Sequence, residues 1–114
     1  MRIWTVATLV MLGTGAIAAT QADIAEYARL SATFDARQGK ADIGPDRRLQ
    51  LADCVLSAFE AARGSQSVPQ LMALMRTVSA GVQFDDPVVV KFTENHGDVY
   101  AQIVKGCRSS VANG

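Results

Sequence analysis

The segment over residues 45–63 constrains the fold more than any other part of the chain. Its polar residues recur at helical spacing and form one narrow stripe, while nearly all its other positions are apolar. The stripe consists of Asp46, Gln50, Asp53, Ser57 and Glu60. A helix that presents so narrow a polar face to water is contacted by neighbours on several sides. We therefore predict that this segment is the central helix of the fold.

Two other segments on either side of it also repeat apolar residues at steps of three and four. The first covers residues 23–38, with an apolar face that begins at Ile24. The other begins after Ser67, which forms a capping-box pattern with Gln70, and ends near Gly81. Both are predicted to be helices.

A last helical segment begins with Asp86 as N-cap and Pro87 at the first helical position. Residues 87–108 form either one helix or two pieces, because Gly97 interrupts the segment at a cost of about 1 kcal/mol relative to alanine. The remaining residues, 109–114, are expected to form a loose C-terminal tail. No segment alternates with period two over a useful length. The predicted fold class is therefore all-α, a compact four-helix array in one domain over residues 23–108.

Two cysteines, Cys54 and Cys107, lie on the apolar flanks of their predicted helices. A domain of this size buries only about 60–65% of its unfolded surface and is marginal without a cross-link. A disulfide between the two cysteines would add roughly 4 kcal/mol in the loop-entropy model. Two free thiols, or a redox or metal role, are the alternatives, but the Cys-x-x-Cys spacing typical of redox work is absent. We predict a structural disulfide.

Residues 1–22 have the layout of a cleavable signal peptide: a positive charge at Arg2, an apolar stretch, and small residues before Ala18 and Ala22. The alternative is a membrane anchor. The uncharged run over residues 3–19 would reach only roughly 25 Å as a helix, short of a hydrocarbon core of about 30 Å. Cleavage after Ala22 is preferred over cleavage after Ala18. Arginine-rich and alanine-rich usage is typical of high-GC bacteria, so the expected location is the periplasm.

The residues after position 22 include ten basic and eleven acidic side chains, a net charge of −1. Such a chain lacks the basic patch of a nucleic-acid-binding protein. No run of like charge suggests binding to anionic lipid, and no stable membrane insertion is expected after cleavage. The expected partner is another periplasmic or envelope protein, in an oligomeric state that the sequence leaves open.

The only histidine, His96, would lie on the apolar face of an unbroken last helix, with Phe92 and Ile103. Three interpretations compete. The histidine is neutral, buried and bonded to a backbone carbonyl or to a hydroxyl such as that of Tyr100 or Tyr27. Alternatively, the helix breaks and His96 lies in a turn. The third interpretation is a functional role, of which pH sensing requires the fewest other residues.

No other pattern indicates a catalytic, cofactor or metal site. One histidine and two bridged cysteines do not supply the three or four ligands that zinc needs. Haem ligation by His96 with Met72 or Met75 lacks an attachment motif, and both methionines are interpreted as core residues. The Asp85–Asp86 pair is explained by helix capping, and residues 46–48 are interpreted as a solvated helix start. No cofactor is predicted.

These absences favour a non-enzymatic protein-binding module, such as an inhibitor or an immunity-type protein. The chain is also judged too small to enclose a large pocket. The first alternative is an acid- or stress-responsive periplasmic chaperone that loosens below about pH 5, near the model carboxylate pKa values. The second is a carrier of haem or another small ligand. An enzyme is the least expected class.

Overall fold

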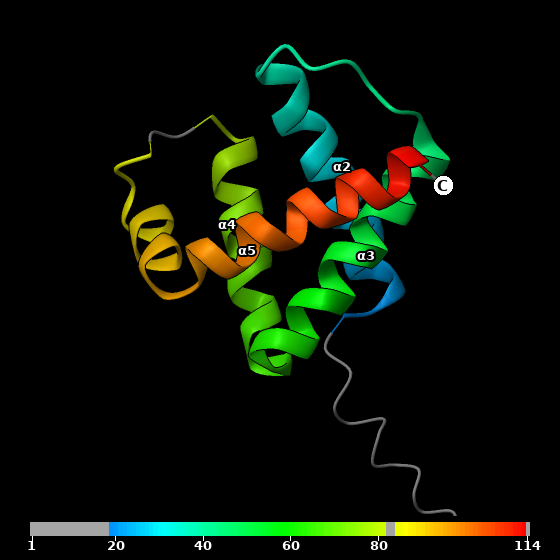
Figure 1. Cartoon of the computed structure of the whole chain (residues 1–114). Helices are drawn as coiled ribbons and strands as arrows, with labels where there is room; N and C mark the ends of the chain where they lie inside the picture. Colours follow the sequence, from blue (N-terminus) through cyan, green and yellow to red (C-terminus); the bar gives the residue numbers. More distant parts are fainter. Residues whose placement is uncertain (1–18, 82–83, 114) are drawn as a thin grey trace, which may run out of the picture.

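The computed structural model describes residues 19–81 and 84–113, and these residues are almost entirely helical (Figure 1). The elements are α2 (Gln21–Arg37), α3 (Pro45–Arg63), a short 3₁₀ helix η1 (Ser65–Ser67), α4 (Val68–Ser79) and α5 (Pro87–Asn113). No strand occurs in these residues, so the predicted all-α class is confirmed. Most of the predicted signal peptide, residues 1–18, lies outside the described part of the chain.

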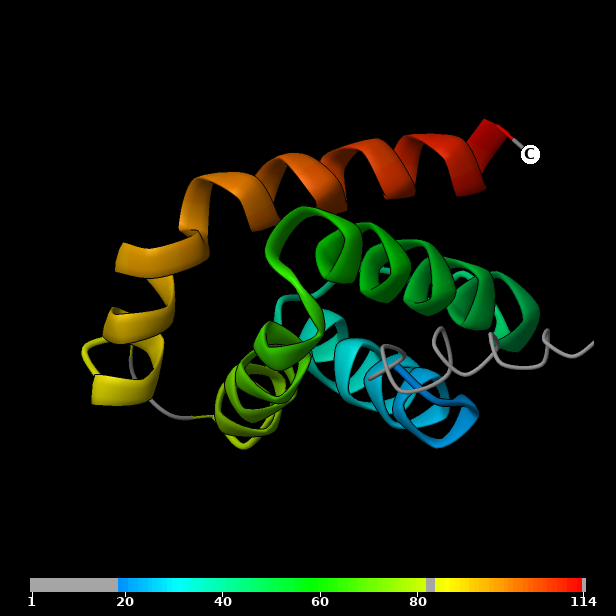
Figure 2. The same ribbon diagram turned by 90° about the horizontal axis from the view of Figure 1, so that it is seen from below.

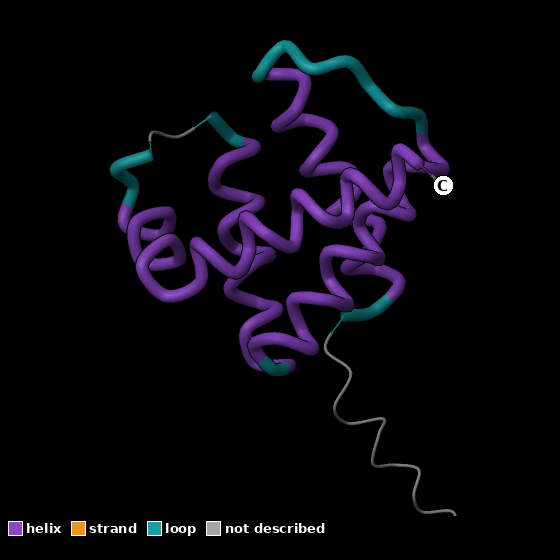
Figure 3. The backbone as a smooth tube through the Cα atoms, viewed as in Figure 1, coloured by secondary structure: helices purple, strands orange, loops and turns teal. Residues whose placement is uncertain are grey.

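The four α-helices pack in a ring. α3 packs against α2 and α5, and α4 packs against the same two helices. α2 and α5 therefore lie on opposite sides of the molecule, as Figure 2 shows with α5 at the top and α2 at the bottom. The loop over residues 38–44 joins α2 to α3 (Figure 3).

The ends of α2 and α3 follow from local sequence. α2 begins before the predicted residue 23 because Thr20 and Asp23 form a capping box. The Thr20 Oγ1 atom accepts from the Asp23 amide at 3.1 Å, and the Thr20 amide donates to Asp23 Oδ2 at 3.2 Å. α3 has the predicted bounds and is flanked by Gly44 and Gly64, whose φ angles of 92° and 91° favour glycine.

The predicted capping box at the start of α4 is wrong. Ser67 has helical backbone angles and makes no side-chain cap; its hydroxyl instead donates to the Gly64 carbonyl at 2.6 Å and closes η1. The side chain of Gln70 bonds to His96. A tertiary contact has therefore replaced the local one that the sequence pattern suggested.

The predicted start of α5 is confirmed, because Asp86 Oδ1 accepts from the Val88 amide at 2.9 Å. α5 is one continuous helix, so the alternative of a break near Gly97 is wrong, although the helix bends along its length (Figure 2). The loose tail expected from residue 109 is not observed up to Asn113. Residues 109–113 are helical, and Val111 packs into the core.

One apolar core joins all four α-helices. Its most buried side chains are Leu51, Ala52, Val55, Leu56, Phe59, Val68, Leu71 and Met72. The predicted disulfide is confirmed: Cys54 of α3 and Cys107 of α5 are bonded, with Cα atoms 5.8 Å apart. Within the described residues, none of the helices is long and apolar enough to cross a membrane.

Candidate functional site

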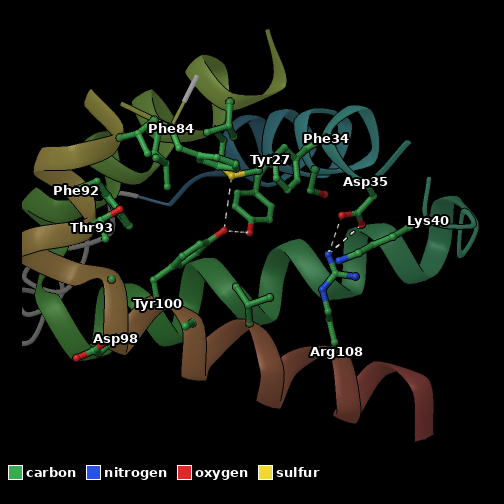
Figure 4. Close-up of a pocket in the computed structure, with 18 residues that line it drawn as sticks. Tyr27, Phe34, Asp35, Lys40, Phe84, Phe92, Thr93, Asp98, Tyr100 and Arg108 are labelled. Atoms are coloured by element: carbon green, nitrogen blue, oxygen red, sulfur yellow. Dashed lines mark hydrogen bonds and ion pairs between the residues drawn. The ribbon is translucent and has the colours of Figure 1, made fainter. Parts of the chain in front are cut away.

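A cavity of about 580 Å³ opens between α2, α4 and α5 (Figure 4). Its lining comes from these three helices and from the two loops that precede α3 and α5. The lining residues are Tyr27, Ser31, Phe34, Asp35, Lys40, Leu74, Met75, Val78, Phe84, Val89, Phe92, Thr93, Gly97, Asp98, Tyr100, Ala101, Val104 and Arg108. The cavity therefore lies on the side of α5 that faces α2 and α4.

The walls of this cavity are mostly apolar. α4 contributes Leu74, Met75 and Val78, all buried, because they form the apolar face of that helix. α5 contributes the buried side chains of Val89 and Phe92. Phe84 also lines the cavity but is 68% exposed. An apolar body can therefore pack against α4 and α5.

Two tyrosines meet in the interior of the cavity. The hydroxyl oxygens of Tyr27 on α2 and Tyr100 on α5 are 2.6 Å apart, although the residues are separated by 73 positions. The Tyr100 hydroxyl also donates to the Met75 sulfur at 3.6 Å. Burial raises the pKa of Tyr27 well above its usual value, with a further rise from Tyr100. Burial likewise raises the pKa of Tyr100, to about 12, so both phenols stay neutral at physiological pH.

A buried ion cluster forms one end of the cavity. The Asp35 carboxylate, 2% exposed, accepts from Arg48 Nη1 at 2.8 Å and from Arg108 Nη2 at 2.9 and 3.1 Å. Burial alone would raise the pKa of Asp35, but the hydrogen bonds and charges of the two arginines outweigh it and the pKa is lowered. Asp35 is therefore ionised near neutral pH and neutralises part of the arginine charge.

Arg48 is buried, although the sequence predicts that it is solvated. Residues 46–48 were interpreted as a solvated helix start, but Arg48 is only 5% exposed and extends toward α2. Its Nη2 atom also bonds to the exposed carboxylate of Asp42 at 3.2 Å. Burial of Arg48 follows from its place on the same face of α3 as Leu51, Ala52 and Val55, where its charge requires the Asp35 partner.

The two ends of the cavity differ in charge. Lys40 and Arg108 lie at the end where Asp35 is bound, while Asp98 and Thr93 lie toward the other end (Figure 4). The Lys40 amide donates to the Asp35 carbonyl at 2.9 Å, which holds the lysine next to the ion cluster. The cavity therefore carries cationic side chains at one end and the carboxylate of Asp98 toward the other.

His96 does not line this cavity. Its Nε2 atom bonds to Gln70 Oε1 at 2.8 Å, and its ring packs against Phe59 and Phe92 with centroid distances of 5.3 and 5.1 Å. Burial lowers the pKa of His96, and the charge of Arg63 lowers it further. The histidine thus lies within the helix, as the first interpretation requires, but it is only partly buried, and its partner is an amide side chain rather than a backbone carbonyl or a tyrosine hydroxyl.

The two methionines that were considered as haem ligands lie on α4. Met72 and Met75 are buried as interpreted, and Met75 lines the cavity while His96 does not. Among the described residues, no group of three or more His, Cys, Asp or Glu side chains is placed to hold a metal ion. The cavity is a site that the sequence pattern does not predict.

A signal for this site is nevertheless present in the sequence. On α2, Tyr27, Ser31 and Asp35 recur every four residues. The buried face of this helix therefore ends at the carboxylate of Asp35. On α5, Tyr100 and Arg108 are spaced by eight residues, again on one face. A charged residue in register with an apolar stripe indicates a buried ion pair, because an unpaired buried charge is too costly.

No family model matches this chain, and neither a curated protein nor a solved structure matches it.

Proposed function

We propose that this protein is a non-enzymatic, exported carrier that binds a small, mostly apolar molecule in the cavity between α2, α4 and α5. The single observation that supports the proposal is the cavity itself. Its volume of about 580 Å³ lies within the range of about 300–1,000 Å³ typical of small-molecule sites. The sequence-based preference for a protein-binding module rested partly on the chain being too small for a pocket, and the cavity removes that reason.

The titratable groups of the cavity favour binding over catalysis. A general acid or base works best with a pKa near the operating pH. The pKa values of Tyr27 and Tyr100 are displaced upward and that of Asp35 downward, in each case away from neutrality. These groups are suited to fixing the orientation of a ligand rather than to exchanging protons with it.

A protein-binding module remains the second candidate, in the form of an inhibitor or immunity-type protein. Phe84 is 68% exposed, and Val88 and Val90 of α5 are each 41% exposed. Exposed apolar side chains that gather near one helix end are typical of a protein contact. In this alternative a side chain of the partner would enter the cavity in place of a small molecule.

A neutral fluorescent probe tests the carrier proposal. N-phenyl-1-naphthylamine should bind the mature protein saturably, with one site per chain and a blue-shifted emission. The variant A101W places a large side chain in the cavity from an exposed position and should abolish binding. The matched control A61W, at an exposed position of α3 outside the cavity, should bind as the wild type does. Equal binding by A101W and A61W, or no saturable binding by the wild type, would reject the proposal.

Export is part of the proposal, and the capping box bears on where cleavage occurs. Cleavage after Ala22 would remove Thr20, whose side chain caps α2. Loss of such a cap costs about 1 kcal/mol. We therefore propose cleavage after Ala18, in place of the Ala22 site that the sequence alone favours. Intact-mass measurement of the protein purified from the periplasm should give a chain that begins at Ala19; a chain that begins at Asp23 would contradict this.

A further inference from the structure

We propose that the ligand of the cavity is an amphiphile with a single carboxylate, bound with its head group at Lys40 and Arg108 and its apolar body against α4 and α5. This inference rests on the proposed carrier function and specifies the chemistry of the molecule carried. It follows from the distribution of charge around the cavity, which the volume alone does not determine.

The first argument is the excess of positive charge at one end. Two cationic side chains, Lys40 and Arg108, line that end with a single carboxylate, Asp35. The Asp35 carboxylate is also shared with Arg48, to which it bonds at 2.8 Å, so it cannot neutralise both cations of the lining. A ligand carboxylate would supply the negative charge that this end of the cavity lacks.

The second argument concerns the donors that are still available. The side chain of Arg108 is 37% exposed, and its bonds to Asp35 use only Nη2. A guanidinium has five N–H donors, so the remaining ones can bind a second carboxylate. The ammonium of Lys40 is exposed and forms no ion pair within the described part of the chain. Both cations line the cavity.

The third argument is the orientation that the opposite end imposes. Asp98 lies toward that end and would repel an anionic head group (Figure 4). Between the two ends the lining is apolar except for three hydroxyls. Those of Tyr27 and Tyr100 are bonded to each other, and that of Ser31 donates to the Ala28 carbonyl at 3.1 Å. An alkyl or fused-ring body fits the middle of the cavity, because such a body carries no polar group that would need a hydrogen-bond partner there.

Competition against the bound N-phenyl-1-naphthylamine tests the inference with three probes of equal chain length: decanoate, 1-decanol and decylamine. Decanoate should displace the dye at the lowest concentration and decylamine at the highest. Added salt should weaken decanoate binding while leaving 1-decanol binding unchanged, because the partly exposed charges are screened.

Variants of Lys40 and of a lysine outside the cavity complete the test. K40Q should weaken decanoate binding by about two- to fivefold and K40E by about tenfold, the size expected for a partly exposed ion pair. Neither variant should alter 1-decanol binding. The matched control K105Q removes a lysine from an exposed position of α5 that does not line the cavity, and it should leave decanoate binding unchanged. Lys40 is exposed, so unchanged thermal unfolding of K40E should confirm that the fold is intact.

The outcomes separate the two proposals. Equal affinities for decanoate and 1-decanol, tighter binding of decylamine, or an unchanged decanoate affinity in K40E would each overturn the carboxylate inference while the carrier function stands. Failure of all three probes to displace the dye would also overturn the inference. Failure of the dye itself to bind would instead reject the carrier function.

Discussion

The two sides of α5 are held in different ways. On the side toward α3, the helix is joined by the Cys54–Cys107 bond and by packing of Phe59 against Phe92, with ring centroids 5.7 Å apart. On the side toward α2, the connections are polar: the Tyr27–Tyr100 hydrogen bond and the Asp35–Arg108 ion pair. The cavity lies on this second side. We infer that the first side supplies most of the stability and that the second side leaves space for a ligand.

Removal of the disulfide should have the largest effect, because it weakens the first side directly. The bond closes a sequence separation of 53 residues, for which the loop-entropy model gives about 4 kcal/mol. The double variant C54A/C107A should lose about that free energy of unfolding in urea, followed by circular dichroism at 222 nm. The wild type measured with reductant serves as its control. A loss below about 1 kcal/mol would mean that apolar packing alone holds α5 to α3.

The next largest effect should come from D35N, on the second side. Loss of the carboxylate leaves Arg48 buried beside Arg108 without its principal partner. Breaking a buried pair in this way typically costs about 3–5 kcal/mol, and we expect about 3 because Asp42 still bonds to Arg48 and Arg108 is partly exposed.

D42N is the matched control for D35N, since it removes a carboxylate from the same arginine at an exposed position. It should cost less than about 1 kcal/mol in the same urea titration. Equal losses in the two variants would show that burial does not distinguish the two ion pairs and would contradict the proposed ion cluster.

A smaller effect is expected from the tyrosine pair. Y27F and Y100F each remove one hydroxyl of the bond that connects α2 to α5, and each should cost about 1 kcal/mol. The double variant Y27F/Y100F should cost less than the sum, because both single variants remove the same bond. Strict additivity in the urea titrations would show that the two hydroxyls are not coupled.

The two sides also differ in how far the sequence predicts them. Helix bounds were predictable where the signals are local, as at Pro45–Arg63 between two glycines and at Asp86 before Pro87. The disulfide was predictable because only two cysteines are present. These features determine most of the α3–α5 side.

The second side was not predictable by the same means, because its contacts are distant in sequence. The Tyr27–Tyr100 and Asp35–Arg108 contacts each join residues 73 positions apart. A single sequence shows that each residue lies on the apolar face of its helix, but not which helix that face meets. The local capping signal at Ser67 failed for a related reason, since the side chain of Gln70 bonds to α5 instead.

The smallest expected effect is that of pH on the free energy of unfolding. The two sides of α5 should respond over different pH ranges, because a histidine titrates on one side and an aspartate on the other. On the α3 side, the lowered pKa of His96 means that the unfolded chain takes up a proton more readily than the folded one. Stability should therefore decline as the pH falls below the usual histidine value of 6.5. On the α2 side, the lowered pKa of Asp35 has the same sign but acts only as the pH falls below the usual aspartate value of 3.8.

Urea titrations from about pH 8 to about pH 3 should thus show two stages of decline in the wild type, in the ranges set by the unperturbed histidine and aspartate pKa values. The variant H96Q keeps a polar side chain opposite Gln70 and should lose only the upper stage. D35N should weaken only the lower stage, part of which remains because the Arg76 hydrogen bond also lowers the pKa of Glu26. An upper stage that persists in H96Q would assign it to other groups and would remove His96 as a pH-sensing residue. A wild type that loses its near-ultraviolet circular dichroism within the upper stage would instead favour the acid-responsive chaperone, because loosening at mildly acidic pH is what that function requires.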